Sequence, residues 1–475
     1  MITNKNIEHI PLTALVHSWV EQLVNNKELL HSAVEQHGSP INIHSLEPFS
    51  DNIHEYCQVF QDCGLKHKIF FARKANKCIE FPLAAAHRGE AADTASYREL
   101  KQCLEAGIGS ENLILTAAVK NQKLLELAVE NNVTIVIDNL DEFHLLKKVV
   151  SQKQRNVSVN VRLGGFNVNG EILPTRFGFS LEEALQFITK LHNQEPLINY
   201  TGLHFHLNGY SIEHRAAAIE QSLQLVDLLL AENITTVSLD IGGGYLMNYL
   251  ADESQWNLFN SELKRAVLQQ RQPLTYQNDA LGMTLVNDRL HGEPSVYPYY
   301  NKLHKAGFLS AVLNSYSLKY KQPVSKVLKD RKIELRIEPG RSLLDQCGIT
   351  VAKVAFRKKD TEGNWLIGLE MNRTQLRSSS ADFLLDPIHL PMTHLLQNNE
   401  AVSGFLVGSY CLEQELILKR KISFAQFPQV GDLIVFPNTA GYMMHFFESE
   451  AHLFELAKNL IYREGNLYIS QEINV

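Results

Sequence analysis

The sequence predicts an α/β protein of two domains, in which a (β/α)8 barrel of the TIM type precedes a mostly antiparallel β domain. Three observations support this fold class. The chain has 475 residues, which is more than one hydrophobic core usually organises. Eight β-rich runs alternate with helical runs along most of the chain. Beyond residue 345, the β-rich runs follow one another with only turn signals between them.

The eight β-rich runs define the predicted barrel. Segments such as YRELKQCLEAG and NQKLLELAVENN lie between them and place apolar residues at helical spacing. Alternation of this kind favours a parallel sheet, and a count of eight favours a closed barrel over an open sheet. The runs are 67–75, 89–96, 112–117, 134–138, 157–163, 200–207, 236–242 and 332–340.

The same pattern gives the expected domain boundaries. We expect residues 1–44 to form an N-terminal segment that packs with the C-terminal β domain, residues 45–345 to form the barrel, and residues 346–475 to form the β domain. The connection between the last two barrel runs contains a long insertion at about 246–330. A connection of this length is either an ordinary helical subdomain or a lid over the barrel mouth.

Composition excludes several classes of protein. Hydrophobic residues make up 45% and charged residues 20% of the chain, and the net charge of −7 gives no reason to expect nucleic acid or an anionic membrane as partner. No apolar run approaches the ~20 residues that a spanning helix needs. The N-terminus lacks a basic start followed by an apolar core, and the six cysteines contain no CxxC. We therefore expect a cytoplasmic protein with reduced thiols.

The runs share a chemical feature at their C-terminal ends. Nearly every run ends in a functional side chain or a glycine, and in a (β/α)8 barrel the active site lies at these ends. Polar residues also occur there simply because loops begin, but seven such ends together indicate an enzyme. The residues are Lys74, Asp93, Asp138, Arg162, His206, Gly242 and Glu338.

Lys74 ends the first run, in FFARKAN. A lysine that points into a barrel mouth is either desolvated or paired, and burial lowers its pKa and makes the neutral amine available to attack an aldehyde. The alternative for Lys74 alone is an ordinary surface lysine.

Two glycine-containing ends suggest a phosphate site. Gly242, Gly243 and Gly244 in DIGGGY let backbone N–H groups approach an anion closely, and EPGR adds Gly340 and the guanidinium of Arg341. The loops after the seventh and eighth strands are where barrel enzymes often bind phosphate.

Glu338 and the two histidines of HFH admit several roles. A carboxylate beside a bound pyridine nitrogen would keep that nitrogen protonated and strengthen its pull on electrons, whereas the plainer role for Glu338 is an ion pair with Arg341. His204 and His206 lie two apart on one strand and share a face. They are metal ligands, core histidines, or a ring stacked on an aromatic cofactor. The Lys, Asp, Arg and Glu at other strand ends disfavour metal.

Taken in order, these motifs resemble the fold-type III decarboxylases that use pyridoxal 5′-phosphate (PLP), the group that contains diaminopimelate, ornithine and arginine decarboxylases. The resemblance extends from about residue 40 to residue 450. It implies an alanine-racemase-like barrel, a Schiff base between PLP and Lys74, Glu99 near that lysine, and His206 stacked on the cofactor ring. The implied cofactor-binding residues are Lys74, Asp93, Arg162, His206, Gly242, Gly243, Gly244, Glu338, Gly340, Arg341 and Tyr442.

The resemblance continues into the C-terminal domain. GSYCLEQE matches the motif of the catalytic cysteine, so Cys411 is implied as the proton donor to the carbanion that follows loss of CO2. In the family this cysteine comes from the other subunit, which implies a homodimer with shared active sites. Arg377, His389 and Glu413 are the implied substrate-binding residues.

Departures from the family pattern point to a divergent amino acid or amino-acid conjugate as substrate. Asn208 and Gly209 stand where the family has glycine and serine, and Leu412 precedes Glu413 where an acid usually follows the cysteine directly. Three other functions compete with decarboxylation. They are a PLP-dependent racemase of the same fold, which Glu338 disfavours, a non-catalytic PLP-binding or regulatory homologue, and a metal-dependent barrel hydrolase.

Overall fold

The computed structural model describes residues 10–378, 383–392 and 400–471. These residues form two compact units, each described here by itself. The barrel unit comprises residues 50–246 and 303–343 with residue 471, and the β unit comprises residues 10–49, 247–302, 344–378, 383–392 and 400–470. Within this described part of the chain, no helix combines the length and the apolar character needed to cross a membrane.

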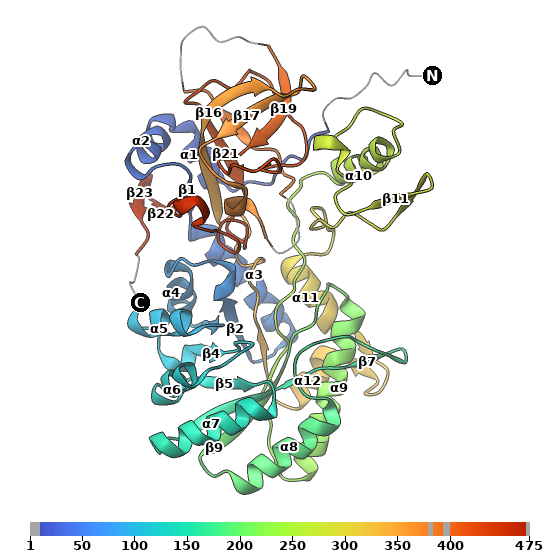
Figure 1. Cartoon of the computed structure of the whole chain (residues 1–475). Helices are drawn as coiled ribbons and strands as arrows, with labels where there is room; N and C mark the ends of the chain where they lie inside the picture. Colours follow the sequence, from blue (N-terminus) through green and yellow to red (C-terminus); the bar gives the residue numbers. More distant parts are fainter. Residues whose placement is uncertain (1–9, 379–382, 393–399, 472–475) are drawn as a thin grey trace. The chain divides into compact units, whose positions relative to one another are not determined.

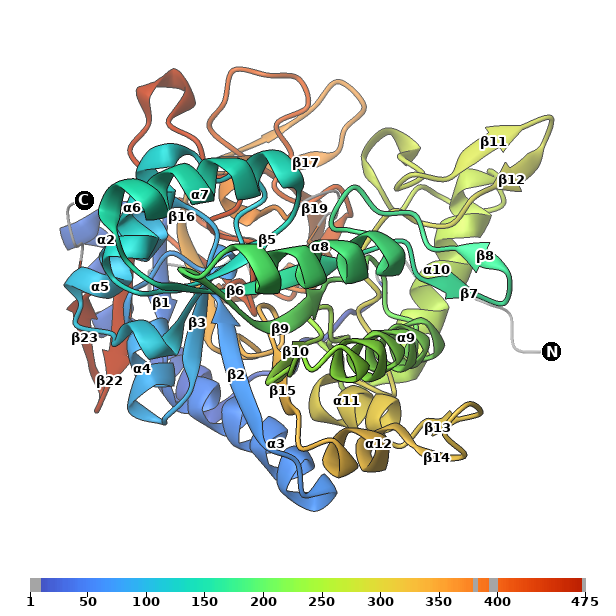
Figure 2. The same cartoon turned by 90° about the horizontal axis from the view of Figure 1, so that it is seen from below.

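The barrel unit contains a closed barrel of eight strands, all paired in parallel (Figure 2). Going round it, the order is β2, β3, β4, β5, β6, β9, β10 and β15, and β15 closes on β2. The predicted fold class is confirmed, since each of the eight β-rich runs overlaps one strand. The strands are β2 (His67–Ala72), β3 (Ala91–Thr94), β4 (Leu113–Leu115), β5 (Thr134–Ile137), β6 (Val157–Leu163), β9 (Ile198–Phe205), β10 (Ser238–Asp240) and β15 (Glu334–Ile337).

Helices surround the barrel strands (Figure 2). Several of them begin with a side chain that accepts a backbone N–H of the first turn, as Ser96, Asn121, Asn139, Ser180 and Ser211 do. These caps fix where the strand-to-helix loops end. The helices are α3 (Glu47–Cys63), α4 (Glu80–His87), α5 (Tyr97–Glu105), α6 (Gln122–Glu130), α7 (Leu140–Lys153), α8 (Leu181–Gln194), α9 (Ile212–Ala231), α11 (Lys305–Leu313) and α12 (Val324–Asp330).

Short elements decorate the barrel loops. A hairpin lies between β6 and α8, and a second lies between α11 and α12. They are β7 (Asn167–Val168) with β8 (Glu171–Ile172), β13 (Tyr316–Ser317) with β14 (Gln322–Pro323), and the 3₁₀ turns η1 (Arg73–Ala75) and η2 (Ser110–Asn112).

The β unit is built on a mixed, mostly antiparallel sheet (Figure 1). Its main path runs β20, β19, β17, β16, β1, β22, β23, while β21 pairs with β16 and β18. The N-terminal strand β1 thus lies between β16 and β22. Only β1 with β22 and β17 with β19 are parallel among the described pairs of this sheet. The strands are β1 (Ile41–His44), β16 (Gly348–Lys359), β17 (Trp365–Leu369), β18 (Ile388–Leu390), β19 (Val402–Val407), β20 (Ile422–Phe424), β21 (Leu433–Pro437), β22 (Lys458–Arg463) and β23 (Asn466–Ile469).

Two N-terminal helices cover part of this sheet (Figure 1). Trp19 of α1 and Leu30 of α2 are buried in one hydrophobic cluster with Ile43 of β1 and Val351 of β16. Burial of such side chains is worth roughly 1.5–3 kcal/mol each. The N-terminal segment is therefore part of the β unit's core. The helices are α1 (Ser18–Asn25) and α2 (Lys27–His37).

The long insertion requires a correction to the expected boundaries. We expected residues 246–330 to be an insertion within the barrel domain, but residues 247–302 belong to the β unit. Phe259 and Leu263 are buried there in one cluster with Leu369 and Phe436, so apolar packing makes the segment part of the β unit. The segment contains α10 (Glu253–Val267), η3 (Tyr276–Asn278), β11 (Thr284–Val286) and β12 (Arg289–His291).

Candidate active site

Lys74 lies in the turn η1, which follows β2 directly. Its Nζ is 3.4 Å from Oδ2 of Asp93 at the end of β3, and its side chain is 38% exposed. The preceding Arg73 is buried and donates to the carbonyl of Lys77 at 3.1 Å, which stabilises the turn. Of the two expected states, desolvated or paired, the structure has the paired one, and the amine stays accessible.

Asp93 is a fixed, buried acid beside that amine. It is 1% exposed, and its pKa is raised by burial and by the carboxylate of Glu338, while Lys74 acts in the opposite direction. The loop that follows Asp93 is held by Glu99, whose carboxylate accepts the backbone N–H of Ala95 at 2.6 Å. Glu99 thus stabilises the position of Asp93 through the backbone.

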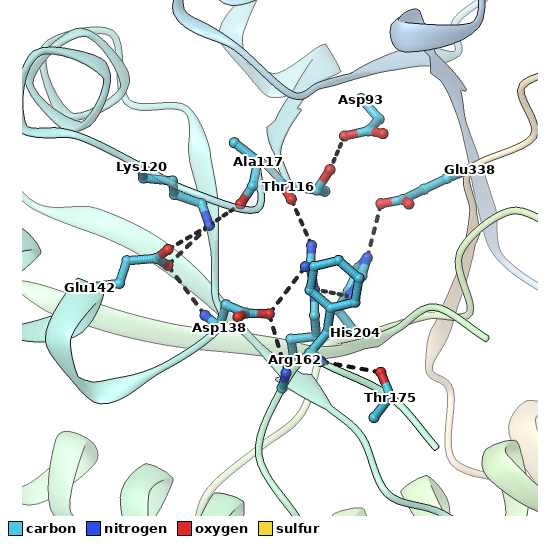
Figure 3. A network of polar contacts seen from close by, with 12 residues as sticks. Asp93, Thr116, Ala117, Lys120, Asp138, Glu142, Arg162, Thr175, His204 and Glu338 are labelled. Atoms are coloured by element: carbon cyan, nitrogen blue, oxygen red, sulfur yellow. Dashed lines mark hydrogen bonds and ion pairs between the residues drawn. The ribbon is translucent and has the colours of Figure 1, made fainter. Parts of the chain in front are cut away.

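A buried polar network joins the ends of five further strands, β4, β5, β6, β9 and β15 (Figure 3). Arg162 Nε donates to His204 Nδ1 at 3.2 Å, and His204 Nε2 lies 3.1 Å from Glu338 Oε1. The guanidinium also donates to Asp138 Oδ1 at 3.1 Å and to the carbonyl of Thr116 at 2.7 Å. The Thr116 hydroxyl donates to Asp93, so the network reaches the acid that pairs with the lysine.

The glycine turn lies next to Glu338. Gly242 and Gly244 have φ of +66° and +87°, which favour glycine. A Cβ on Gly243 would lie 2.4 Å from the carbonyl oxygen of Glu338, so only glycine fits there. From α9, the buried Arg215 donates to the carbonyls of Gly243 and Gly244 at 2.8 and 3.3 Å. Sequence analysis missed Arg215, because an arginine within a helix looks the same whether its side chain is buried or solvated.

The EPGR loop is tied to both neighbouring strand ends. The N–H of Glu338 donates to the carbonyl of Gly242 at 3.0 Å, and the last residue of β2 donates its N–H to the carbonyl of Pro339 at 3.2 Å. Gly340 is buried and Arg341 is half-buried. The two predicted phosphate loops are therefore adjacent, and the second adjoins the strand that precedes Lys74.

His206 follows β9 and exposes its ring at the same end of the barrel. With Asn208 and His214 it lines a cavity of about 140 Å³. The surrounding barrel wall limits solvation of the ring and, with the positive charge of Lys74, lowers the pKa of His206 to about 3. The ring is thus neutral at physiological pH.

His204 also has the geometry of a metal ligand. Its ring and the carboxylates of Asp240 and Glu338 place three possible ligand atoms within 4.8 Å of one another. However, Nδ1 is hydrogen-bonded to the guanidinium of Arg162, and that cation would adjoin any bound metal. This arrangement favours a role in orienting Glu338 over metal binding.

The substrate residues expected in the β unit are only partly brought together. Arg377 and Glu413 line one cavity of about 510 Å³, to which Tyr276 of the inserted segment also contributes. His389 does not line this cavity. Its Nε2 lies 2.8 Å from Asp432, beside the pairing of β18 with β21.

Cys411 and Tyr442 also lie in the β unit. Cys411 is exposed and is not in a disulfide. Tyr442 has a φ of +71°, and its ring contacts that of Phe446 with 5.7 Å between the ring centroids. A positive φ in a tyrosine is rare and occurs where surrounding contacts impose it, often at a functional site.

Comparison with known proteins agrees with the geometry of the barrel unit. Residues 50–279 match the family model "Pyridoxal-dependent decarboxylase, pyridoxal binding domain". A diaminopimelate decarboxylase of Staphylococcus aureus is 23% identical over 401 residues, which cover 82% of this chain and 81% of that protein.

The chain resembles the fold-type III PLP-dependent decarboxylases. An uncharacterized protein of Sinorhizobium fredii, y4yA, is more similar to this chain than the S. aureus enzyme is, with 27% identity over 426 residues that cover 89% of this chain and 88% of that protein. The structure of a diaminopimelate decarboxylase from M. jannaschii in complex with L-lysine has the same fold. Its TM-score is 0.70 at 17% identity, and the match covers 93% of this chain and 91% of that chain.

Proposed function

We propose that this protein is a fold-type III decarboxylase that removes CO2 from an amino acid or amino-acid-like conjugate, with PLP held on Lys74. One observation carries the proposal. The amine of Lys74 is paired with Asp93, and a single buried network connects Asp93 to the carboxylate of Glu338 across the barrel (Figure 3). An amine and a remote buried acid are the two groups that PLP chemistry requires from a protein.

The residues at the glycine turn fit the phosphate of PLP. No side chain projects from the Gly242–Gly244 turn, and backbone N–H groups in such a turn bind anions. Arg341 adds a guanidinium on the adjacent loop. The ring of His206 would stack on the cofactor ring, since it is exposed and neutral there.

Each of the chain's own groups then has a distinct task. When bound, PLP supplies an electron sink that lowers the barrier to loss of CO2 from the α-carbon. Lys74 supplies the amine that attaches the cofactor, and Asp93 holds that amine in place. Glu338 would keep the pyridine nitrogen of bound PLP protonated, and Arg162 holds the histidine that contacts Glu338.

For the proton that replaces CO2, we propose Cys411 of a second copy of the chain. Its thiol is exposed and not in a disulfide, so it can serve a neighbouring subunit. We further propose that Arg377 and Glu413 bind the substrate and that Tyr442 contacts PLP, in a homodimer with shared active sites. His389 Nε2 lies 2.8 Å from the carboxylate of Asp432, so His389 could bind the substrate only if this contact were broken.

The absorbance spectrum of the purified protein tests the role of Lys74. Wild type should show the yellow absorbance of lysine-bound PLP, and Lys74→Ala should lose it on dialysis. Lys68→Ala is the matched control, because Lys68 lies near the opposite end of the same strand and should leave the spectrum unchanged. A Lys74→Ala protein that stays yellow after dialysis would refute the assignment.

A screen for CO2 release over amino acids and their conjugates tests the reaction. Cys411→Ser should slow turnover by roughly 10²–10⁴-fold, the usual contribution of a positioned proton donor. Chiral analysis of the products separates decarboxylation from racemisation. Inversion at the α-carbon without CO2 release would replace the proposal with a racemase.

A further inference from the structure

We propose that His204 is a positioning residue that holds Glu338 in a fixed orientation as an ionised carboxylate. In the same proposal, the neighbouring Asp240 is the carboxyl group that carries the proton. His204, Asp240 and Glu338 are each at least 97% buried in the barrel unit, with three of their polar atoms within 4.8 Å of one another. The effect of this arrangement on the protonation of the PLP pyridine nitrogen rests on the proposed function. The protonation states of His204, Asp240 and Glu338 are independent of that function.

Hydrogen-bond direction fixes the protonation of His204. The Nε of an arginine can only donate, so Nδ1 of His204, 3.2 Å from Arg162 Nε, must accept. The ring proton of the neutral histidine is therefore on Nε2, 3.1 Å from Glu338 Oε1, and His204 donates to that carboxylate. Burial and the adjacent Arg162 also keep the pKa of His204 well below its ordinary value.

This donor leaves one oxygen of Glu338 for another partner. Oε1 accepts from His204, whereas Oε2 accepts no hydrogen bond from the described residues. Oε2 is not fully enclosed by the surrounding protein atoms, so it remains accessible from the barrel mouth. His204 thus orients Glu338 with one oxygen occupied and one available.

Asp240 is a second carboxyl group in the same dry site. Its Oδ1 accepts the N–H of Gly242 at 2.9 Å, and its Oδ2 is enclosed without a partner. Two carboxylates this close in a buried site do not both ionise. Burial raises the pKa of both carboxyl groups, but Glu338 accepts a hydrogen bond from His204 Nε2 and faces the cations Lys74 and Arg162, so the proton goes to Asp240. In agreement, burial and the charge of Glu338 raise the pKa of Asp240 well above its ordinary value.

The first test uses the full-length protein without cofactor, and its one variant serves only to assign a signal. ¹⁵N NMR of labelled histidine should show His204 as a neutral ring with the proton on Nε2, assigned by the loss of that signal in His204→Phe. A ring protonated on Nδ1, or on both nitrogens, would overturn the proposal. Since PLP is absent from this experiment, its outcome is independent of whether the protein uses PLP.

The second test uses PLP labelled with ¹⁵N in the pyridine ring as the probe. In His204→Phe the pyridine signal should move toward the unprotonated position, as it should in Glu338→Gln. Asp240→Asn should leave the signal and the dissociation constant of PLP within about twofold of wild type, because the amide replaces an already neutral group. Melting temperature identifies variants that fail to fold. A folded His204→Phe protein with the wild-type signal, or an Asp240→Asn protein that behaves like Glu338→Gln, would overturn the proposal.

Discussion

Substitution of Arg215 by methionine tests how the glycine turn is held in shape. Arg215 is 1% exposed, and its guanidinium donates to the carbonyls of Ile241, Gly243 and Gly244 at 2.6, 2.8 and 3.3 Å. Methionine is of similar length and apolar, so it fills the space but donates nothing. The turn would then keep its volume but lose the side-chain donor of the Gly243 and Gly244 carbonyls, while the Tyr245 hydroxyl still donates to Gly242.

The magnitude follows from the two shorter bonds. An enclosed carbonyl that loses its donor costs about 1–3 kcal/mol, so the free energy of unfolding should fall by about 2–5 kcal/mol in Arg215→Met. Part of this loss is offset, because an arginine is costly to bury and its Nε lacks a partner in the native structure. The free energy of unfolding of Arg215→Lys should lie between those of wild type and Arg215→Met, since an ammonium can reach one or two of the carbonyls.

Urea denaturation followed by circular dichroism measures the effect. Arg331→Met is the matched control, because Arg331 belongs to the same unit but its side chain is 22% exposed and its partner is the 42% exposed Asp227. A loss of about 1 kcal/mol or less is expected there. If Arg215→Met is no less stable than Arg331→Met, the guanidinium does not support the turn and the reasoning is refuted.

Three further predictions concern buried groups elsewhere. In the native structure the ammonium of Lys120 lies 2.9 Å from the buried carboxylate of Glu142. Lys120→Met leaves that carboxylate buried without a counter-charge and should lower the free energy of unfolding by about 3–5 kcal/mol. The double variant Lys120→Met/Glu142→Leu should regain most of the lost stability in the same urea assay. Burial lowers the pKa of His44 from 6.5 to about 4, so the unfolded chain binds a proton at a higher pH than the folded chain does. The free energy of unfolding should therefore fall by about 3 kcal/mol as the pH drops from about 6.5 to 4. The fall should be smaller in His44→Gln, measured by denaturation at each pH. Gly243→Ala should be destabilised by roughly 1–3 kcal/mol, because its Cβ would meet a backbone carbonyl oxygen, whereas Gly307→Ala, with open space around it, should match wild type or exceed it in melting temperature.

The barrel was predictable because its signal is local. Some strands, for example β5 (Thr134–Ile137), read as short apolar runs, others, such as β6 (Val157–Leu163), alternate apolar and polar residues, and the helices between them repeat their apolar residues at helical spacing. The motif residues were predictable for the same reason, since a strand end and its loop are contiguous in sequence. Lys74, Asp93 and the glycine turn could be placed on one rim before any coordinates were known.

The inserted segment was not predictable from such patterns. Residues 247–302 leave the barrel unit and bury side chains such as Phe259 in the core of the β unit. Their apolar spacing predicts a helix but carries no information about the surface on which that helix packs. The same applies to His389, whose partner Asp432 lies 43 residues away and becomes its neighbour only through the pairing of β18 with β21.

The sequence by itself determined the eight alternating units, the β-rich second unit and the set of functional residues at the strand ends, because period, turn chemistry and motif order are written along the chain. The tertiary structure alone decided which of these side chains touch: that Arg162 donates to His204, that His204 faces Glu338, and that Arg215 holds the glycine turn. Hydrogen bonds between strands and helices far apart in sequence depend on how the barrel closes, and the direction of each proton follows only once donor and acceptor are face to face.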